Sequence, residues 1–163
     1  MTLSNKSGNQ KENFFGTRNE PIRKSIYKTA GIIGFLVKVL RTKYPEKRIS
    51  PAYIQRIGYF LKRENVIDFK YSMYPDGPGS NAISVELSVA THKNIVEINY
   101  LEDKKGYFVE PGENLNKMID LLTNEEKNKI NKVADEFGQY DLRELSEKAT
   151  DVFILNRPTL KFS

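Results

Sequence analysis

The chain of 163 residues contains no cysteine and a single histidine, His92. Without cysteine it cannot form disulfides, cysteine-ligated zinc sites, iron–sulfur clusters or a thiol nucleophile. One histidine alone does not build the usual transition-metal site. His92 is then either a group that titrates near neutral pH at a contact with a partner, or an ordinary surface residue near the end of a helix. We therefore expect neither a metal nor a cofactor.

Long apolar runs are also missing. The longest extends from Ala30 to Val37, AGIIGFLV, far short of the roughly 20 residues that span a bilayer, so it predicts a buried helix. The first residues, MTLSNKSGNQKEN, are polar and show no apolar run behind a basic cluster, which argues against a secretory signal. Together with the lack of cysteine, this favours a cytoplasmic protein that does not enter a membrane.

Motifs of common enzymes are missing as well. The stretch Pro75–Gly79 can offer backbone amides to an anion at a helix N-terminus, or it is simply a tight structural turn. It contains neither the Gly-x-x-x-x-Gly-Lys-Ser/Thr pattern nor the Gly-x-Gly-x-x-Gly pattern. The carboxylate pairs Glu125–Glu126 and Asp135–Glu136 are adjacent in sequence and do not converge as an acid–base pair would. We expect a protein that is not an enzyme.

Charge is spread unevenly along the chain, whose formal net charge is +5. The net charge is +3 over residues 1–24, +6 over residues 25–94 and −4 over residues 95–163. A basic half can meet nucleic acid or an acidic protein partner. The alternative is a solvated surface that is simply rich in lysine.

The length fits one domain with a proper core. Residues 1–24 are rich in Asn, Lys, Ser and Gly and show no period, so they predict a flexible arm. Residues 25–157 should form the globular domain. Pro158 should end it, which leaves residues 158–163 as a frayed tail.

Two helices are predicted at the start of the domain. Between residues 25 and 44 apolar side chains recur at steps of three and four, which places them on one helix face. Gly31 and Gly34 would each cost roughly 1 kcal/mol relative to alanine, so we expect another helix to pack closely against them. Ser50 is a good N-cap and Pro51 suits the first position of the second helix.

A strand, a turn and a third helix should follow. Val66–Tyr74, VIDFKYSMY, alternates apolar and polar residues and predicts a short strand. Pro75–Gly79 predicts a turn. Ser80 should cap a third helix, on which Glu86 and Lys93 are expected to be exposed.

The remaining elements are a hairpin and helices. Ile95–Leu101 and Tyr107–Glu110 flank a polar turn, which is the pattern of a β-hairpin. A helix is predicted over Asn114–Leu122. Two more should start at capping boxes, which are formed by Thr123 with Glu126 and by Asp141 with Glu144.

This order predicts a mainly α protein with a small β-hairpin, in which a winged-helix-like core is followed by C-terminal helices. In such an architecture the third helix can enter a major groove while the hairpin touches the DNA backbone beside it. The C-terminal helices should pack behind the core or mediate pairing of two copies.

Several of these segments resemble the Panacea domain family and the related YwgA-type proteins. The second helix, Ile54–Leu61 (IQRIGYFL), resembles that family's Leu-Gln-Lys-Leu-x-Tyr helix. Tyr74 with Gly77–Pro78 corresponds to its Tyr-Gly-Pro turn, and Leu145 with Ala149–Thr150 to its late Leu-x-x-x-Ala-Thr helix. The resemblance covers roughly residues 29–155.

Two positions depart from the family's pattern. Pro75–Asp76 separates the tyrosine from Gly-Pro, and Gly58 stands where a large apolar residue is usual. The resemblance implies a non-enzymatic interaction protein, such as an antitoxin that binds and neutralises a partner protein, or a proteolytic adaptor of the SocA type.

A partner is expected on the third helix and on the basic helix before it. The third helix contains no arginine, although strong DNA-recognition helices usually carry several, and this favours a protein partner. The alternative is a winged-helix transcriptional regulator that binds DNA. Lys43, Lys47, Arg48 and Lys70 could extend the basic face, on which each phosphate contact would steepen the salt dependence of binding by about one unit. The predicted binding residues are Arg56, Lys62, Arg63, Tyr74, Gly77, Pro78, Asn81, Ser84, Ser88 and Lys93.

Overall fold

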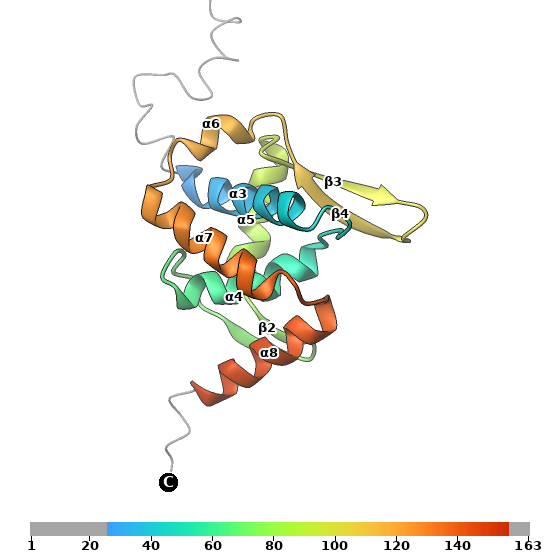
Figure 1. The fold of residues 1–163 in the computed structure, drawn as a ribbon, viewed down its shortest axis with the longest axis vertical. Coiled ribbons are helices and arrows are strands. Elements are labelled where there is room, and N and C mark those ends of the chain that lie inside the picture. Colours follow the sequence, from blue (N-terminus) through green and yellow to red (C-terminus); the bar gives the residue numbers. More distant parts are fainter. Residues whose placement is uncertain (1–25, 157–163) are drawn as a thin grey trace, which may run out of the picture.

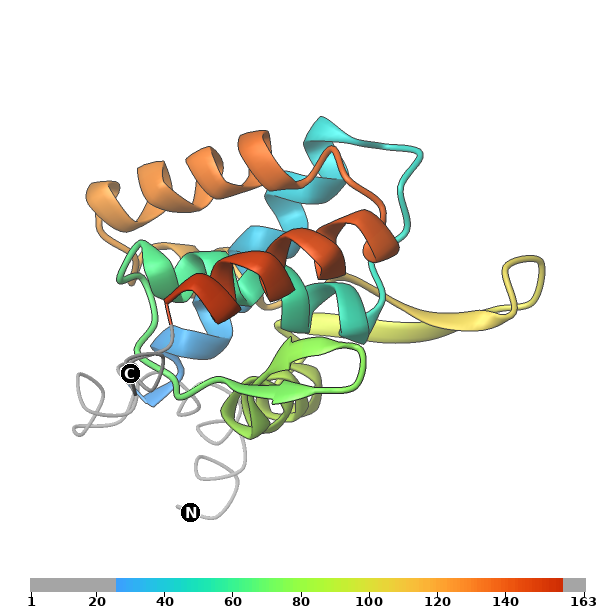
Figure 2. The ribbon, with the colours of Figure 1, turned by 90° about the horizontal axis from the view of Figure 1, so that it is seen from below.

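The computed structural model describes residues 26–156, and the predicted arm (1–24) and tail (158–163) lie outside this range. Helix α3 lies at the centre and packs against α5, α6, α7 and β4, while the hairpin β3–β4 projects away from the helices (Figures 1 and 2). The elements are α3 (Lys28–Lys43), α4 (Pro51–Arg63), β1 (Ser72–Tyr74), β2 (Gly77–Gly79), α5 (Asn81–His92), β3 (Val96–Leu101), β4 (Gly106–Pro111), α6 (Leu115–Ile119), α7 (Asn124–Phe137) and α8 (Leu142–Leu155).

The four predicted N-caps are confirmed, because each capping residue forms the expected hydrogen bond, whereas the first helix begins at Lys28 and not at residue 25. Ser50 accepts a hydrogen bond from the Tyr53 amide at 3.1 Å, and Ser80 accepts one from the Ala82 amide. Both capping boxes are complete, in α7 from Thr123 and in α8 from Asp141. These local bonds satisfy amides that a helix start leaves without intrahelical partners.

The two glycines of α3 allow α6 to pack closely, as predicted. A Cβ atom on Gly34 would lie 2.6 Å from Leu115 Cδ1 and 2.9 Å from Ile95 Cγ2. A Cβ atom on Gly31 would lie 3.1 Å from Met118 Cβ. Helix α6 itself is shorter than the predicted Asn114–Leu122 and ends at Ile119.

The strand predicted over Val66–Tyr74 is wrong for its first six residues. Only Ser72–Tyr74 forms a strand, while Val66 and Ile67 are both buried, which an alternating strand does not permit. The predicted turn is also partly wrong, because Gly77–Gly79 forms β2 and pairs antiparallel with β1. The pairing of β2 with β1 was not predictable from the local sequence, because Gly-Pro-Gly has low strand propensity.

The second hairpin forms the wing of a winged-helix-like core. Strand β3 pairs with β4 from Val96 opposite Pro111 to Leu101 opposite Gly106. Ile49, between α3 and α4, makes an isolated antiparallel bridge to Val109 of β4. Ile49 therefore takes the place of a third strand, and it ties the start of α4 to the base of the wing.

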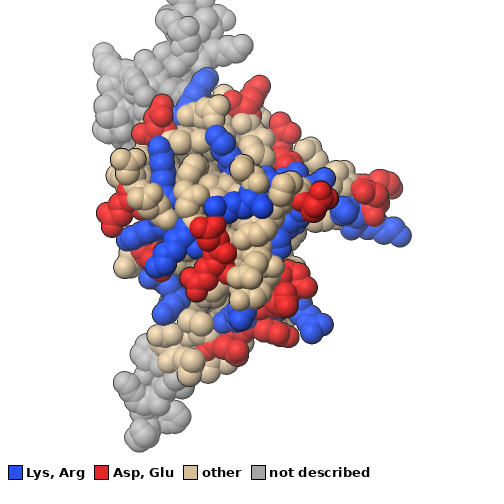
Figure 3. Space-filling view, in the orientation of Figure 1, with Lys and Arg blue, Asp and Glu red and all other residues tan. Residues whose placement is uncertain are grey.

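The uneven charge along the sequence is largely balanced within the fold. Lys28 pairs with Glu126 at 2.9 Å, Arg41 with Glu110 at 2.9 Å, and Lys43 with Asp135 at 2.7 Å. Each pair joins a cation of the basic first part to an acid of the acidic last part. Basic and acidic side chains are consequently interspersed on the face shown in Figure 3. Pairs that stay partly exposed to solvent in this way stabilise the fold little, but they leave no uniform basic surface there.

Candidate functional site

Helix α5 exposes one continuous stripe, which we call the α5 stripe and which consists of Asn81, Ser84, Val85, Ser88 and His92. These residues are spaced by three, four and seven positions, so they lie on one helix face. Val85 is 59% exposed and is the one aliphatic residue of the stripe. The stripe contains no lysine and no arginine. It is therefore a small-residue surface with an apolar centre, and it carries no fixed charge.

Gln55 of α4 holds the N-terminal end of this stripe in place. Its side-chain Nε2 donates to the Ser80 carbonyl and to Ser84 Oγ, both at 2.9 Å, and its Oε1 accepts from the Ser80 amide at 2.8 Å. The Tyr74 ring lies against Gly79, where a Cβ atom would come within 3.0 Å of the ring. Tyr74 remains 44% exposed and lies against Gly79, two residues before Asn81, which places it near the N-terminal end of the stripe.

Arg56, Gly77 and Pro78 were expected at a binding surface but are buried. Arg56 is only 7% exposed, and its Nη1 donates to the Pro78 carbonyl at 2.9 Å. Its Nε donates to Ser146 Oγ of α8 at 3.3 Å. Gly77 adopts a φ of +132°, a conformation that favours glycine, and a Cβ there would lie 3.0 Å from Arg56 Nε. Burial lowers the pKa of Arg56, and the charge of Asp76 counteracts this. Arg56 joins α4, β2 and α8.

Glu86 of α5 and Lys93, the residue directly after this helix, were expected to be exposed, and both are half-buried. Oxygen Oε1 of Glu86 is enclosed and has no hydrogen-bond donor in the described part of the chain. Burial raises the pKa of Glu86. The Lys93 ammonium lies over the Tyr27 ring, 5.6 Å from its centroid. Lys93 therefore lies outside the α5 stripe.

The remaining predicted cations do not form one basic face. Lys47 Nζ donates to the Tyr140 carbonyl at 2.7 Å and lies 4.9 Å from the centroid of the Tyr53 ring. Arg48 donates to the Pro45 carbonyl. Lys62 lies 3.9 Å from Asp68. Arg63 and Lys70 are exposed, as predicted.

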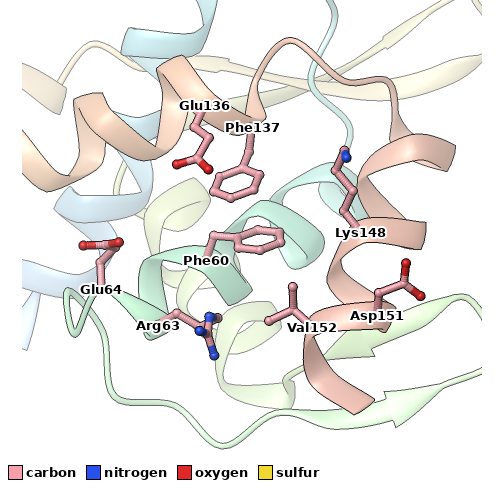
Figure 4. A pocket seen from close by; sticks show the side chains of 8 residues that line it. All are labelled: Phe60, Arg63, Glu64, Glu136, Phe137, Lys148, Asp151 and Val152. Atoms are coloured by element: carbon pink, nitrogen blue, oxygen red, sulfur yellow. The ribbon is translucent and has the colours of Figure 1, made fainter. Parts of the chain in front are cut away.

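A cleft of about 490 Å³ opens between α4, α7 and α8 (Figure 4). Its floor contains Phe60, Phe137 and Val152. The Phe60 and Phe137 rings are stacked, with centroids 3.8 Å apart and planes 12° apart. No sequence pattern indicated this cleft, because its three apolar residues come from three different helices, of which α4 is far along the chain from α7 and α8.

Charged side chains surround this apolar floor. Figure 4 shows Glu64 and Glu136 on one side of the phenylalanine pair, and Lys148 with Asp151 on the other. Arg63, one of the predicted binding residues, also lines the cleft. Glu64 forms a salt bridge with Lys132 at 3.3 Å. The arrangement suits a ligand with an apolar centre and charged ends.

The structure offers no sign of a metal centre or a membrane span within residues 26–156. No three His, Asp or Glu side chains in this range are grouped so that they could hold a metal ion. None of the helices described there is long and apolar enough to cross a bilayer. Comparison with models of known protein families, with curated proteins and with solved structures found no match to the chain.

Proposed function

We propose that this chain is a non-enzymatic module of the cytoplasm that binds and neutralises a partner protein, as an antitoxin or adaptor does. The partner binds the α5 stripe and the neighbouring Tyr74. The observation that carries the proposal is the composition of this surface. Helix α5 occupies the position of a recognition helix in the winged-helix-like core, yet its outer face displays Val85 and small polar groups without a lysine or arginine.

The physical argument rests on charge. Binding to duplex DNA draws most of its free energy from cations that neutralise phosphates, and the α5 stripe has none to contribute. The centres of protein–protein interfaces are instead depleted of charged residues and enriched in tyrosine. Val85 and Tyr74 are both exposed, and Tyr74 lies against Gly79 just before α5, so the surface has the composition of such a centre. The resemblance to the Panacea domain family points to the same class of function.

The test uses the products of the neighbouring open reading frames, each co-expressed with this chain. We expect one of these products to co-purify with the wild-type chain. The wild-type chain should also relieve the toxicity of that product. Val85→Asp should weaken this binding at least about tenfold, because a carboxylate would be desolvated at the interface. Isothermal titration calorimetry measures the affinity. The melting temperature should not change, because the Val85 side chain is exposed.

Leu142→Asp is the matched control for that experiment. Leu142 is also an exposed apolar residue, but it lies at the start of α8, outside the α5 stripe. An aspartate in the first turn of a helix is tolerated well. This variant should bind the partner as the wild type does. Equal binding by Val85→Asp and the wild type, or no binding by either neighbouring product, would refute the proposal.

A second candidate, a DNA-binding regulator, is favoured by one observation. The wing projects from the helices, and Lys104 and Lys105 lie in its exposed turn. We expect only weak binding of duplex DNA, falling about tenfold between 50 and 200 mM salt, since two lysines make few phosphate contacts. Fluorescence anisotropy with a labelled duplex measures this. A loss of about a thousandfold or more over the same range would favour the regulator instead.

A further inference from the structure

The cleft between α4, α7 and α8 lies on a different face of α4 from the α5 stripe. Gln55 faces α5, since its side chain bonds to Ser84, and Gly58 lies against Ile83 of α5. Phe60 and Arg63 line the cleft. We propose that this cleft is a second docking site, which binds a short peptide segment with one aromatic or large aliphatic residue flanked by an acidic and a basic residue.

The size and floor of the cleft suit such an anchor residue. Its volume of about 490 Å³ lies within the range of sites that enclose small ligands. Phe60 is buried, so the accessible part of the floor belongs to the half-buried Phe137 and Val152. The stacking of Phe137 on Phe60 fixes the orientation of this floor before anything binds. An aromatic side chain of a peptide can therefore lie on a surface that needs little reorganisation.

The rim supplies charges of both signs. Lys148 and Asp151 are three positions apart on α8, and this spacing places them one turn apart on the same face. Neither takes part in a salt bridge within residues 26–156, although the Lys148 ammonium lies 4.5 Å from the centroid of the Tyr140 ring. Both charges thus remain available to residues that flank an anchor.

Glu136 adds a second available carboxylate. It lies in the last turn of α7, in which the helix itself has no basic residue. Asp135 beside it is paired with Lys43, whereas Glu136 has no salt bridge in the described range. A basic residue of a peptide would find favourable positions near Glu136 and Asp151. The same carboxylates would repel nucleic acid, so a peptide of mixed charge is the occupant that the rim fits.

The test uses the full chain labelled with nitrogen-15 and an acetylated, amidated peptide, Ala-Glu-Ala-Phe-Ala-Lys-Ala. We expect saturable shifts in the amide resonances of Phe137 and of residues 148–152, with a Kd of about 1 mM or below. Replacing the peptide's phenylalanine by alanine should weaken binding at least about tenfold, because the anchor makes the central contact. Saturation with shifts elsewhere, no saturable shift, or equal binding of the alanine peptide would overturn the proposal.

A charge-reversed variant tests the rim separately from the floor. Lys148→Glu should weaken binding of this peptide about fivefold and favour one in which lysine replaces the glutamate. Lys38→Glu is the control, since Lys38 is exposed on α3 and does not line the cleft. An unchanged preference in Lys148→Glu would contradict the assigned role of the rim. Neither result bears on the α5 stripe, which the Val85→Asp experiment examines alone.

Discussion

Replacing Gly112 by alanine is expected to lower the free energy of unfolding by about 3 kcal/mol, the upper end of the range for overpacking. A Cβ atom at this position would collide with the Asn94 carbonyl oxygen, and it would lie 2.7 Å from the Asn94 carbonyl carbon and 2.8 Å from that of Ile95. These are backbone atoms, so no side-chain rotation can relieve the overlap. The turn between α5 and β3 would have to move as a whole.

That turn is held by several hydrogen bonds from the segment around Gly112. The Gly112 amide donates to the Ile95 carbonyl at 2.9 Å. The backbone amide of Asn114 donates to the Asn94 carbonyl, and the side-chain Nδ2 of Asn114 donates to the Lys93 carbonyl, both at 2.9 Å. A displacement would strain or break these bonds together. Because they join the end of α5 to the base of the wing, the orientation of both would change.

Urea denaturation followed by circular dichroism measures this loss, and thermal unfolding should show a fall of about 6–12 °C for a chain of this size. Gly106→Ala is the control in the wing. Its Cβ atom would lie 3.3 Å from the end of the Phe108 ring, which can shift, so we expect a change below about 1 kcal/mol. Wild-type stability in Gly112→Ala would show that the turn is more adaptable than its packing indicates.

Replacing Arg56 by alanine should lower the free energy of unfolding by about 3 kcal/mol, through a lost charged hydrogen bond and an unsatisfied acceptor. The Pro78 carbonyl is buried and would lose its guanidinium donor. Ser146 would lose a partner at the same time, which would weaken the attachment of α8. Arg56→Lys should lose most of this stability as well, because an ammonium group does not reproduce the fork of the guanidinium.

Arg63→Ala is the matched control, because the sequence predicted the same role for both arginines. Arg63 is exposed at the end of α4, and we expect a change below about 0.5 kcal/mol. Chemical denaturation of the three variants side by side measures the difference. If Arg56→Ala were as stable as Arg63→Ala, the structural role of Arg56 would be refuted.

Gly58 has no side chain, and the space that this leaves beside α4 is filled by a residue from another segment. The Tyr71 hydroxyl occupies that space, 2.7 Å from where a Cβ would lie, and donates to the Gln55 carbonyl at 3.1 Å. Tyr71 lies 13 residues after Gly58 in the sequence, so only the tertiary structure shows that its hydroxyl fills this space.

The sequence by itself determined the features that depend on neighbouring residues. The caps at Ser50 and Ser80, the boxes from Thr123 and Asp141, and the wing hairpin all follow from interactions within a few positions. The close approach of a helix to the α3 glycines was also foreseeable, because glycine within a helix needs a compensating contact. The winged-helix-like order followed from these elements.

Only the tertiary structure decided which polar groups remain exposed. Arg56 has the spacing of a surface residue, but β2 and α8 cover it. The basic first part of the chain meets the acidic last part, as in the pair Lys43–Asp135, so a basic surface predicted from composition is largely neutralised. The cleft at Phe60 and Phe137 arises from helices far apart in sequence. Burial and charge pairing depend on contacts across the fold, and a pattern of neighbouring residues does not contain them.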